Sequence, residues 1–268
     1  MNGLSVSQYG RGRSCCRRNR PTIGIVMRGF TRSDHDIWLS AKETAAAQGF
    51  NVVTFAGRAL QSPIDSHGQS NIIYDLIDPS RLDGVVMLTS GLALYVGREG
   101  IQAFVHDLGD LPLVSLQMPL PDIPSVLVDD YQGMREVVDH MIEVHQCRRI
   151  AFIRGPVTHK GAEDRYRAYV ESLSDHDIPL DPAMISPPSR RWSDPQGIER
   201  FLSTLELDAG EPDALIGASA GLAQQGIAAL RGRGLQVPEN VTVAGFDDFP
   251  YVSSVMPPMT TARVPFKE

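Results

Sequence analysis

The sequence predicts an α/β protein with two doubly wound parallel-sheet lobes around a ligand cleft. Three observations lead to this fold class. Nearly continuous Val/Ile/Leu runs, typical of strands buried on both faces, alternate with helical stretches. The alternation restarts around Val128-Asp129-Asp130. Polar residues follow the strand-like runs, and open parallel sheets bind their ligands beyond the carboxyl ends of the strands.

The first set of elements begins after Pro21. Strand-like runs are predicted at 22–27, 51–55, 84–88, 113–116 and 125–128. Helices are predicted between the earlier runs, at 37–48 and 101–108. This order indicates a parallel sheet covered by helices on both faces.

The second set repeats the alternation without a detectable sequence repeat. In chain order it comprises a helix at 133–144, a strand at 149–153, a helix at 162–173, a strand near Met184, a helix near 196–205, a strand at 214–216, a helix at 222–231 and a strand at 241–244. We therefore assign residues 21–128 to an N-terminal lobe and 129–268 to a C-terminal lobe. The crossover is expected near 126–132, and a return crossover near 257–268.

Residues 1–20 differ from the rest of the chain in composition. They are rich in Gly, Ser and Arg and lack apolar periodicity, which predicts a disordered basic tail. A phosphate-binding arm formed by the arginines is the functional alternative. The tail is too short to hold a three-helix DNA-binding head.

Overall composition is that of a soluble globular protein. Of 268 residues, 42% are hydrophobic and 21% charged, and the net charge of −7 argues against a general nucleic-acid-binding surface. No apolar run approaches the roughly 20 residues that span a bilayer, and the N-terminus lacks the apolar core of a secretory signal. With only three cysteines there is no disulfide framework. These features predict a cytoplasmic protein that does not contact membranes.

Hydrogen-bonding residues gather where the predicted strands end. They occur at 28–35, 89–91, 154–161, 218–220 and 247–248. Because parallel strands end at one edge of a sheet, two such edges facing each other would form a polar cleft. A few fixed donors and acceptors beside an aromatic side chain suit a small polar ligand.

Two motifs, in this order, resemble a known family. RRIAFIRGPVTHKGAEDRYRAYVESL and GFDD followed by PPMTT are similar to elements of the effector-binding core of the LacI/GalR repressors, which has the periplasmic-binding-protein-like (type I) fold. The resemblance covers roughly residues 21–268. It implies a small-molecule sensor that is not an enzyme, needs no cofactor or metal, and binds a small polar metabolite such as a sugar or nucleoside. It also implies a homodimer that contacts DNA only through a separate or missing domain.

The resemblance also implies ligand-binding residues in the C-terminal lobe. Arg165 matches a position that donates to ligand oxygens, and His159 matches one that often contributes. Trp192 falls where the family stacks an aromatic ring on a sugar or base. Two of these residues have a structural alternative: Arg165 could instead cap or pair on a helix face, and Trp192 could be a half-buried packing residue.

Three further positions complete the expected site. Asp247 matches the acidic residue that accepts hydrogen bonds from ligand hydroxyls or amines, and Ser219 matches a polar position that is usually Asn. Asp34 lies in the first-lobe contact region. The alternative for Asp247 is that its carboxylate satisfies backbone N–H groups of a turn.

The sequence departs from the family pattern in two places. Ser219-Ala220 stands where the family has Asn-Asp, which puts carbohydrate specificity in doubt. The chain stops at Glu268, where family members continue with another helix and strand, so the C-terminal portion is expected to be truncated. The segments NIIYDLIDPSRLDGVVML and HQCRRIAFIRGP also resemble sensor domains fused to kinase or cyclic-dinucleotide modules, an alternative output.

An enzyme is the rival class. Residues 217–221 spell G-x-S-x-G between a predicted strand and helix, the context of a hydrolase nucleophile. That hydrolase order needs a histidine after the serine, but the last histidine, His176, precedes Ser219. His140 and His145 would lie about 140° apart on a helix, which argues against a shared metal site. No phosphate-binding glycine motif is present.

Overall fold

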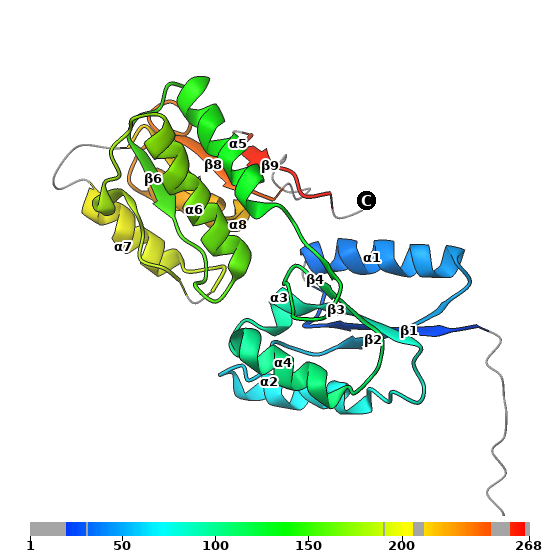
Figure 1. Cartoon of the computed structure of the whole chain (residues 1–268). Helices are drawn as coiled ribbons and strands as arrows, with labels where there is room; N and C mark the ends of the chain where they lie inside the picture. The colour runs from blue at the N-terminus through cyan, green and yellow to red at the C-terminus, as the bar shows by residue number, and fades with distance from the viewer. Residues whose placement is uncertain (1–19, 31, 190, 206–211, 248–257, 266–268) are drawn as a thin grey trace, which may run out of the picture.

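The computed structural model describes residues 20–30, 32–189, 191–205, 212–247 and 258–265, which form two lobes (Figure 1). Each lobe is built on one parallel sheet, with strand order β2-β1-β3-β4-β5 in the first lobe and β6-β7-β8-β9 in the second. The predicted α/β class with two parallel-sheet lobes is therefore confirmed. The assigned lobe boundaries and the basic tail stay predictions; residues 1–19 lie outside the described residues.

The first sheet is covered by helices on both faces. Its strands are β1 (Thr22–Met27), β2 (Asn51–Ala56), β3 (Gly84–Leu88), β4 (Leu113–Leu116) and β5 (Ser125–Val126). The helical segments are α1 (Arg32–Ala47), α2 (Asp65–Ser70), the 3₁₀ helix η1 (Asn71–Leu76), α3 (Thr89–Leu92) and α4 (Gly97–Asp107). In Figure 1, α1 lies on one side of the sheet and α2 and α4 on the other.

The alternation of side chains along β1 explains why helices cover both faces of this sheet. Side chains of a strand point to opposite faces in turn. Ile25 and Met27 pack with residues of α1, whereas Val26 between them belongs to the cluster that includes residues of η1 and α4. Because both faces are buried, every residue of the strand core must be apolar, which is why the run lacks polar alternation.

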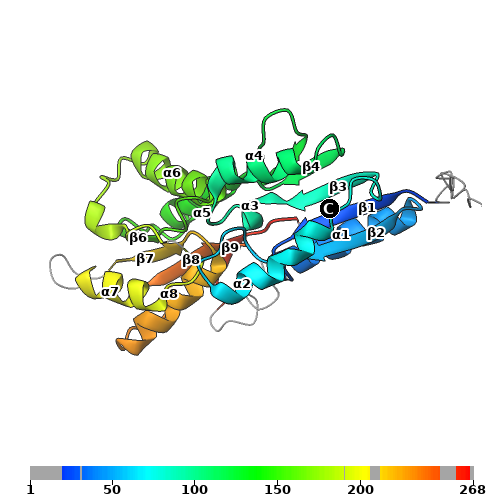
Figure 2. The same cartoon turned by 90° about the horizontal axis from the view of Figure 1, so that it is seen from below.

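The second lobe repeats this arrangement. Its strands are β6 (Ile150–Ile153), β7 (Ala214–Gly217), β8 (Thr242–Phe246) and β9 (Thr260–Ala262). Its helices are α5 (Asp130–Glu143), α6 (Lys160–Asp175), the 3₁₀ helix η2 (Pro182–Met184), α7 (Pro195–Leu205) and α8 (Ala220–Gly232). Figure 2 shows α5 and α6 on one face of the sheet and α7 and α8 on the other. The chain leaves the edge strand β5 at Val126 and starts α5 at Asp130.

The strand predicted near Met184 is wrong. Asp181 Oδ1 accepts a hydrogen bond from Ala183 N at 2.9 Å, and Pro182 occupies the first turn of η2, so the chain forms a 3₁₀ turn there. A strand-like contact follows at Ile185, which forms an isolated parallel bridge with Phe152. Pro187 and Pro188 then lack the N–H groups that a ladder needs, so the segment forms only isolated bridges, the next one between Ser189 and Pro156.

The apolar periodicity of the sequence did not predict the short elements or the first residues of two helices. The structure adds α2, η1, α3 and β9, which are too short for a periodicity to be recognised. Helices α5 and α6 begin earlier than predicted because Asp129 and His159 cap them. The Asp129 side chain accepts from Gln132 N at 2.9 Å, and His159 Nδ1 accepts from Ala162 N at 3.3 Å.

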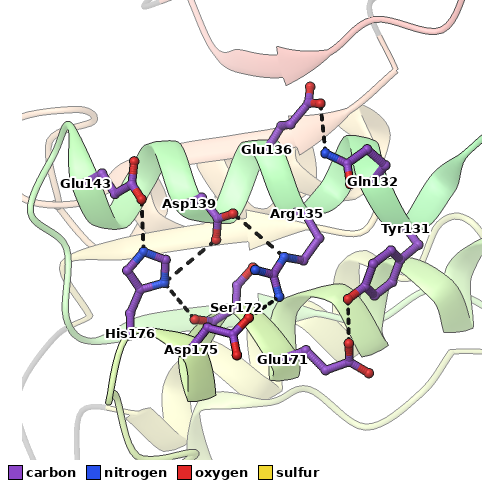
Figure 3. A network of polar contacts seen from close by, with 10 residues as sticks. All are labelled: Tyr131, Gln132, Arg135, Glu136, Asp139, Glu143, Glu171, Ser172, Asp175 and His176. Carbon is purple, nitrogen blue, oxygen red and sulfur yellow. Dashed lines mark hydrogen bonds and ion pairs between the residues drawn. The ribbon is translucent and has the colours of Figure 1, made fainter.

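A polar network joins α5 to α6 (Figure 3). Arg135 pairs with Asp175 at 2.7 Å and, less closely, with Asp139 at 3.7 Å. His176, which follows the last residue of α6, places Nδ1 2.9 Å from the Ser172 carbonyl oxygen and Nε2 3.1 Å from Glu143. The carbonyl group and the Glu143 carboxylate favour the protonated ring, so they raise the pKa of His176.

This network predicts a pH-dependent contribution to stability. The folded-state pKa of His176 is above its ordinary value of 6.5, so the stabilisation is complete below about pH 6.5 and is lost as pH rises through the raised pKa. The difference in urea unfolding free energy between wild type and His176→Gln should therefore shrink as the pH rises above about 6.5. The matched control variant is His106→Gln, which removes an imidazole whose side chain is 91% exposed. A His176→Gln difference that grows with pH would contradict the assignment.

Candidate functional site

The site centres on the guanidinium of Arg165, which is almost fully buried. Arg165 projects from α6, and its Nε donates to Asp130 Oδ1 at 2.8 Å while Nη2 lies 2.7 Å from the same oxygen. Its Nη1 donates to the Ala218 carbonyl oxygen at 2.7 Å. Arg165 therefore links α6 to the first residue of α5 and to the turn after β7. Gly217 permits this turn, because a Cβ there would lie 2.4 Å from Ala223 N in α8.

Asp247 follows β8 and completes the charged cluster. Its Oδ1 lies 3.6 Å from Arg165 Nη2, and its side chain is 14% exposed. Burial raises the pKa of Asp247, Arg165 opposes that effect, and Asp130 adds to it. The residue also has φ of 79°, a conformation that costs a non-glycine residue on the order of 1 kcal/mol or more and is frequent at binding sites.

Aromatic rings enclose the guanidinium. Phe246 lies beneath it, with the Arg165 Cζ 3.6 Å from the ring centroid, and Trp192 lies 5.7 Å away. The His159 ring meets Trp192 edge to face at 4.9 Å between centroids. Gly155 lets the indole approach the backbone, since a Cβ there would be 2.9 Å from the Trp192 ring. The second lobe thus offers apolar ring surface beside a carboxylate.

His159 is neutral at this site. Burial, followed by the positive charges of Arg165 and Arg28, lowers the pKa of His159 from 6.5 to about 3. Its Nδ1 accepts from Ala162 N, so we assign the ring proton to Nε2. His159 can therefore donate one hydrogen bond from Nε2 without carrying charge.

The first lobe approaches this cluster through Arg28, which pairs with Asp34. Asp34 is buried and pairs with Arg28 at 3.4 Å, and Arg28 is near enough to affect His159 of the other lobe. The two lobes also touch directly, because Thr158 Oγ1 donates to the Leu94 carbonyl oxygen at 3.0 Å. The charged cluster therefore lies at an interface between the lobes.

A cavity of about 680 Å³ lies at the connection between the lobes. Its lining includes Leu116 and Gln117 from the first lobe, the connecting residues 126–129, and residues 261–265 after and within β9. Phe246 lines it too, so the ring beneath Arg165 also borders this hinge cavity. The predicted return crossover near 257–268 stays a prediction, since 248–257 and 266–268 lie outside the described residues.

The structure brings together four of the six predicted site residues: Arg165, His159, Trp192 and Asp247. Ser219 is at the same strand edge, but its buried hydroxyl caps α8 by accepting from Leu222 N at 3.2 Å. Asp34 lies in the first lobe, where it pairs with Arg28 at 3.4 Å. Asp130 and Phe246 were not predicted as site residues, although Asp130 lies where the strand and helix alternation restarts and Phe246 lies in the GFDD motif. The sequence alone does not show that Asp129 caps α5 whereas Asp130 binds Arg165.

The features considered for enzyme or metal chemistry have other roles. Ser219 has an extended backbone with φ of −148° and caps a helix, which differs from a strained nucleophile turn. The expectation that His140 and His145 lie apart is wrong: their ring centroids are 4.9 Å apart, because α5 ends at Glu143 and the chain turns back. Among the described residues no group of three His, Cys, Asp or Glu side chains is placed to hold a metal ion.

Two parallel-sheet lobes with a buried polar cluster at their interface define a periplasmic-binding-protein-like domain. Residues 138–268 match the family model of the periplasmic binding protein-like domain. The transcriptional regulator DegA of Bacillus subtilis is 25% identical over 195 residues, which cover 73% of this chain and 56% of DegA. RegA of Clostridium saccharobutylicum is 26% identical over 258 residues, covering 94% of this chain and 73% of RegA.

Solved structures agree on the fold. A LacI family transcriptional regulator from Mycobacterium smegmatis superposes with a TM-score of 0.74 at 22% identity, covering 91% of this chain and 85% of that chain. The lac repressor dimer bound to operator and the anti-inducer ONPF gives 0.72 at 20% identity, covering 94% and 83%. The chain thus has the fold of LacI-type regulators and is similar to them in sequence, as its motifs predict. It spans only 56% of the length of DegA and of the probable repressor ExuR of Bacillus subtilis.

The described helices are each too short or too polar to cross a membrane.

The coupling of the two carboxylates through Arg165 gives a prediction for Asp130→Asn. Since the negative charge of Asp130 raises the pKa of Asp247, its removal should lower the pKa of Asp247, and the freed guanidinium should lower it further. Carbon-13 NMR of the Asp247 carboxyl group across a pH titration measures this shift. Asp129→Asn removes the same charge one residue earlier and keeps a helix cap, so it should change the pKa less. Equal shifts in the two variants would refute the proposed coupling.

Proposed function

We propose that this chain is the sensing domain of a LacI/GalR-type transcriptional regulator, whose cleft binds a small hydroxylated metabolite without chemical turnover. One observation supports the proposal best. Arg165, Asp247 and Trp192 come from different segments of the second lobe and lie close together at its interface with the first lobe. A sugar or nucleoside has both the hydroxyl groups and the flat face that such a site can bind.

The hydrogen-bonding groups favour a ligand that is not an anion. Three of the nitrogen groups of Arg165 are already occupied by Asp130, Ala218 and Asp247, so little positive charge is available. Asp247 can accept hydrogen bonds, and the neutral His159 can donate one. We therefore infer that hydroxyl or amine groups are bound at Asp247 while a ring of the ligand packs on Trp192.

Signalling would follow from closure of the lobes. A ligand that contacts both lobes stabilises the closed arrangement by the difference between its affinities for the closed and open states. The connection at 126–130 joins the first sheet to α5, whose first residue binds Arg165. Ligand contacts at Asp247, which Arg165 joins to Asp130, can thus alter the segment about which the lobes move.

The output is proposed from the relatives. DegA is named a transcriptional regulator, and the similar lac repressor structure is a dimer on operator DNA. By analogy we propose a cytoplasmic homodimer in which DNA is bound by a part of the regulator other than the two described lobes. Binding without catalysis agrees with Ser219 serving as a helix cap.

A thermal-shift screen tests the proposal. Neutral sugars and nucleosides should include a compound that stabilises the protein by RT ln(1 + [L]/Kd), about 2.7 kcal/mol at a hundredfold excess over Kd, with no turnover. The phosphorylated form of that compound should stabilise the protein less. In an Asp247→Ala variant the affinity should fall roughly tenfold or more, because a hydrogen bond to a charged group is lost.

Two controls make this result specific. Asp181→Asn alters a carboxylate that caps η2 near the opposite edge of the sheet and should leave affinity unchanged. The sequence has two tryptophans, so in a Trp38→Phe background the fluorescence of Trp192 should respond to the same compound. Equal stabilisation of wild type and Asp247→Ala, or an unresponsive Trp192, would reject this site.

A further inference from the structure

Apart from the connecting residues 126–130, one turn of the second lobe contacts the first lobe directly. This turn, residues 156–159, lies between β6 and α6. Thr158 Oγ1 donates to the Leu94 carbonyl oxygen of the first lobe at 3.0 Å. Leu94 follows α3, which lies on the side of the first lobe that faces the second (Figure 1). This hydrogen bond can form only while the two lobes are close together.

The turn is held firmly within its own lobe. Pro156 is buried and forms an isolated parallel bridge with Ser189. The His159 N–H donates to the Pro156 carbonyl oxygen at 3.0 Å, and His159 Nδ1 caps α6. The His159 ring packs edge to face on Trp192. Because its neighbours on both sides are fixed, Thr158 reaches the first lobe with little further loss of conformational entropy.

The first lobe presents a carbonyl group that suits this hydroxyl group. The carbonyl oxygens of Thr89, Leu92 and Ala93 each accept from a backbone N–H of the first lobe. The carbonyl oxygen of Leu94, the next residue, accepts from Thr158. Carbonyl groups at the end of a helix need donors from outside the helix. Thr158 therefore extends the hydrogen bonding of α3 across the interface between the lobes.

Arg28 adjoins the same part of the first lobe. Its side chain lies against α3, since a Cβ added at Gly91 would be 2.9 Å from Arg28 Cδ. Its positive charge is close enough to His159 of the turn to lower the pKa of that ring. The His159 ring is therefore neutral and does not repel the guanidinium. The turn can thus approach α3 and Arg28 together.

We propose that residues 156–159 are a latch, which stabilises the closed arrangement of the lobes before any ligand binds. The proposal rests on lobe closure as the signal of the proposed sensor. Thr158 provides the bond to the first lobe, and His159 connects the latch to the Trp192 ring on which the ligand is proposed to pack. The ligand then supplies only the remaining part of the closure free energy. The latch therefore sets both the closed fraction of the empty protein and the apparent ligand affinity.

Single-molecule fluorescence energy transfer tests the latch without a ligand. The three cysteines of the chain are replaced by alanine, and fluorophores are attached through Ser66→Cys on α2 and Gln224→Cys on α8, one exposed position in each lobe. Thr158→Val removes the hydroxyl group and keeps the shape of the side chain. Because Thr158 is exposed and its bond competes with water, the closed-to-open ratio should fall roughly two- to tenfold. Thr158→Ser keeps the donor and should keep the ratio close to that of wild type.

The matched control is Thr204→Val. Thr204 Oγ1 also donates to a backbone carbonyl oxygen, that of Phe201, but within α7, so its loss should leave the ratio unchanged. The proposal is overturned if the wild-type protein is mostly open, if Thr158→Val leaves the ratio unchanged, or if Thr158→Ser or Thr204→Val lowers it as much as Thr158→Val. The latch and the sensing function can fail separately, because this measurement uses no small molecule and the thermal-shift screen uses no measure of closure.

Discussion

The buried guanidinium of Arg165 is the interaction on which the site depends. It is held by Asp130 at the start of α5, by the Ala218 carbonyl after β7 and, more loosely, by Asp247 after β8. A cation taken out of water is costly unless carboxylates and carbonyls surround it, so these segments are constrained to meet. The same contacts place Asp247 and the Trp192 ring beside each other at the interface of the lobes.

The rest of the fold brings these residues together. Parallel strands buried on both faces end at one edge. Gly155, which follows β6, and Gly217, the last residue of β7, let rings and helices approach that edge closely. The connection between the lobes enters the cluster through Asp130 itself. Binding at Asp247 is thereby connected to the hinge through Arg165 and Asp130, which is the physical basis for proposing a sensor.

The fold was predictable from the sequence where the apolar runs were long and uniform. Buried strands such as Thr22–Met27 appear as unbroken apolar runs, and the structure places them as predicted. The 3₁₀ turn at Met184 was not predictable in this way, because capping by Asp181 and the following prolines override the local apolar signal. For the site, motif resemblance indicated Arg165, Trp192 and Asp247. The role of Asp130 depends on which of two adjacent carboxylates faces α6, and that is decided by tertiary packing.

A double-mutant cycle on Asp130 and Arg165 tests the central claim most directly. Urea unfolding free energies are measured for wild type, Asp130→Asn, Arg165→Met and the double variant. If the buried pair organises the site, each single variant leaves an unbalanced group, and the coupling energy should be roughly 2 kcal/mol or more. Additivity within about 0.5 kcal/mol would show that the two residues act independently and would contradict the account.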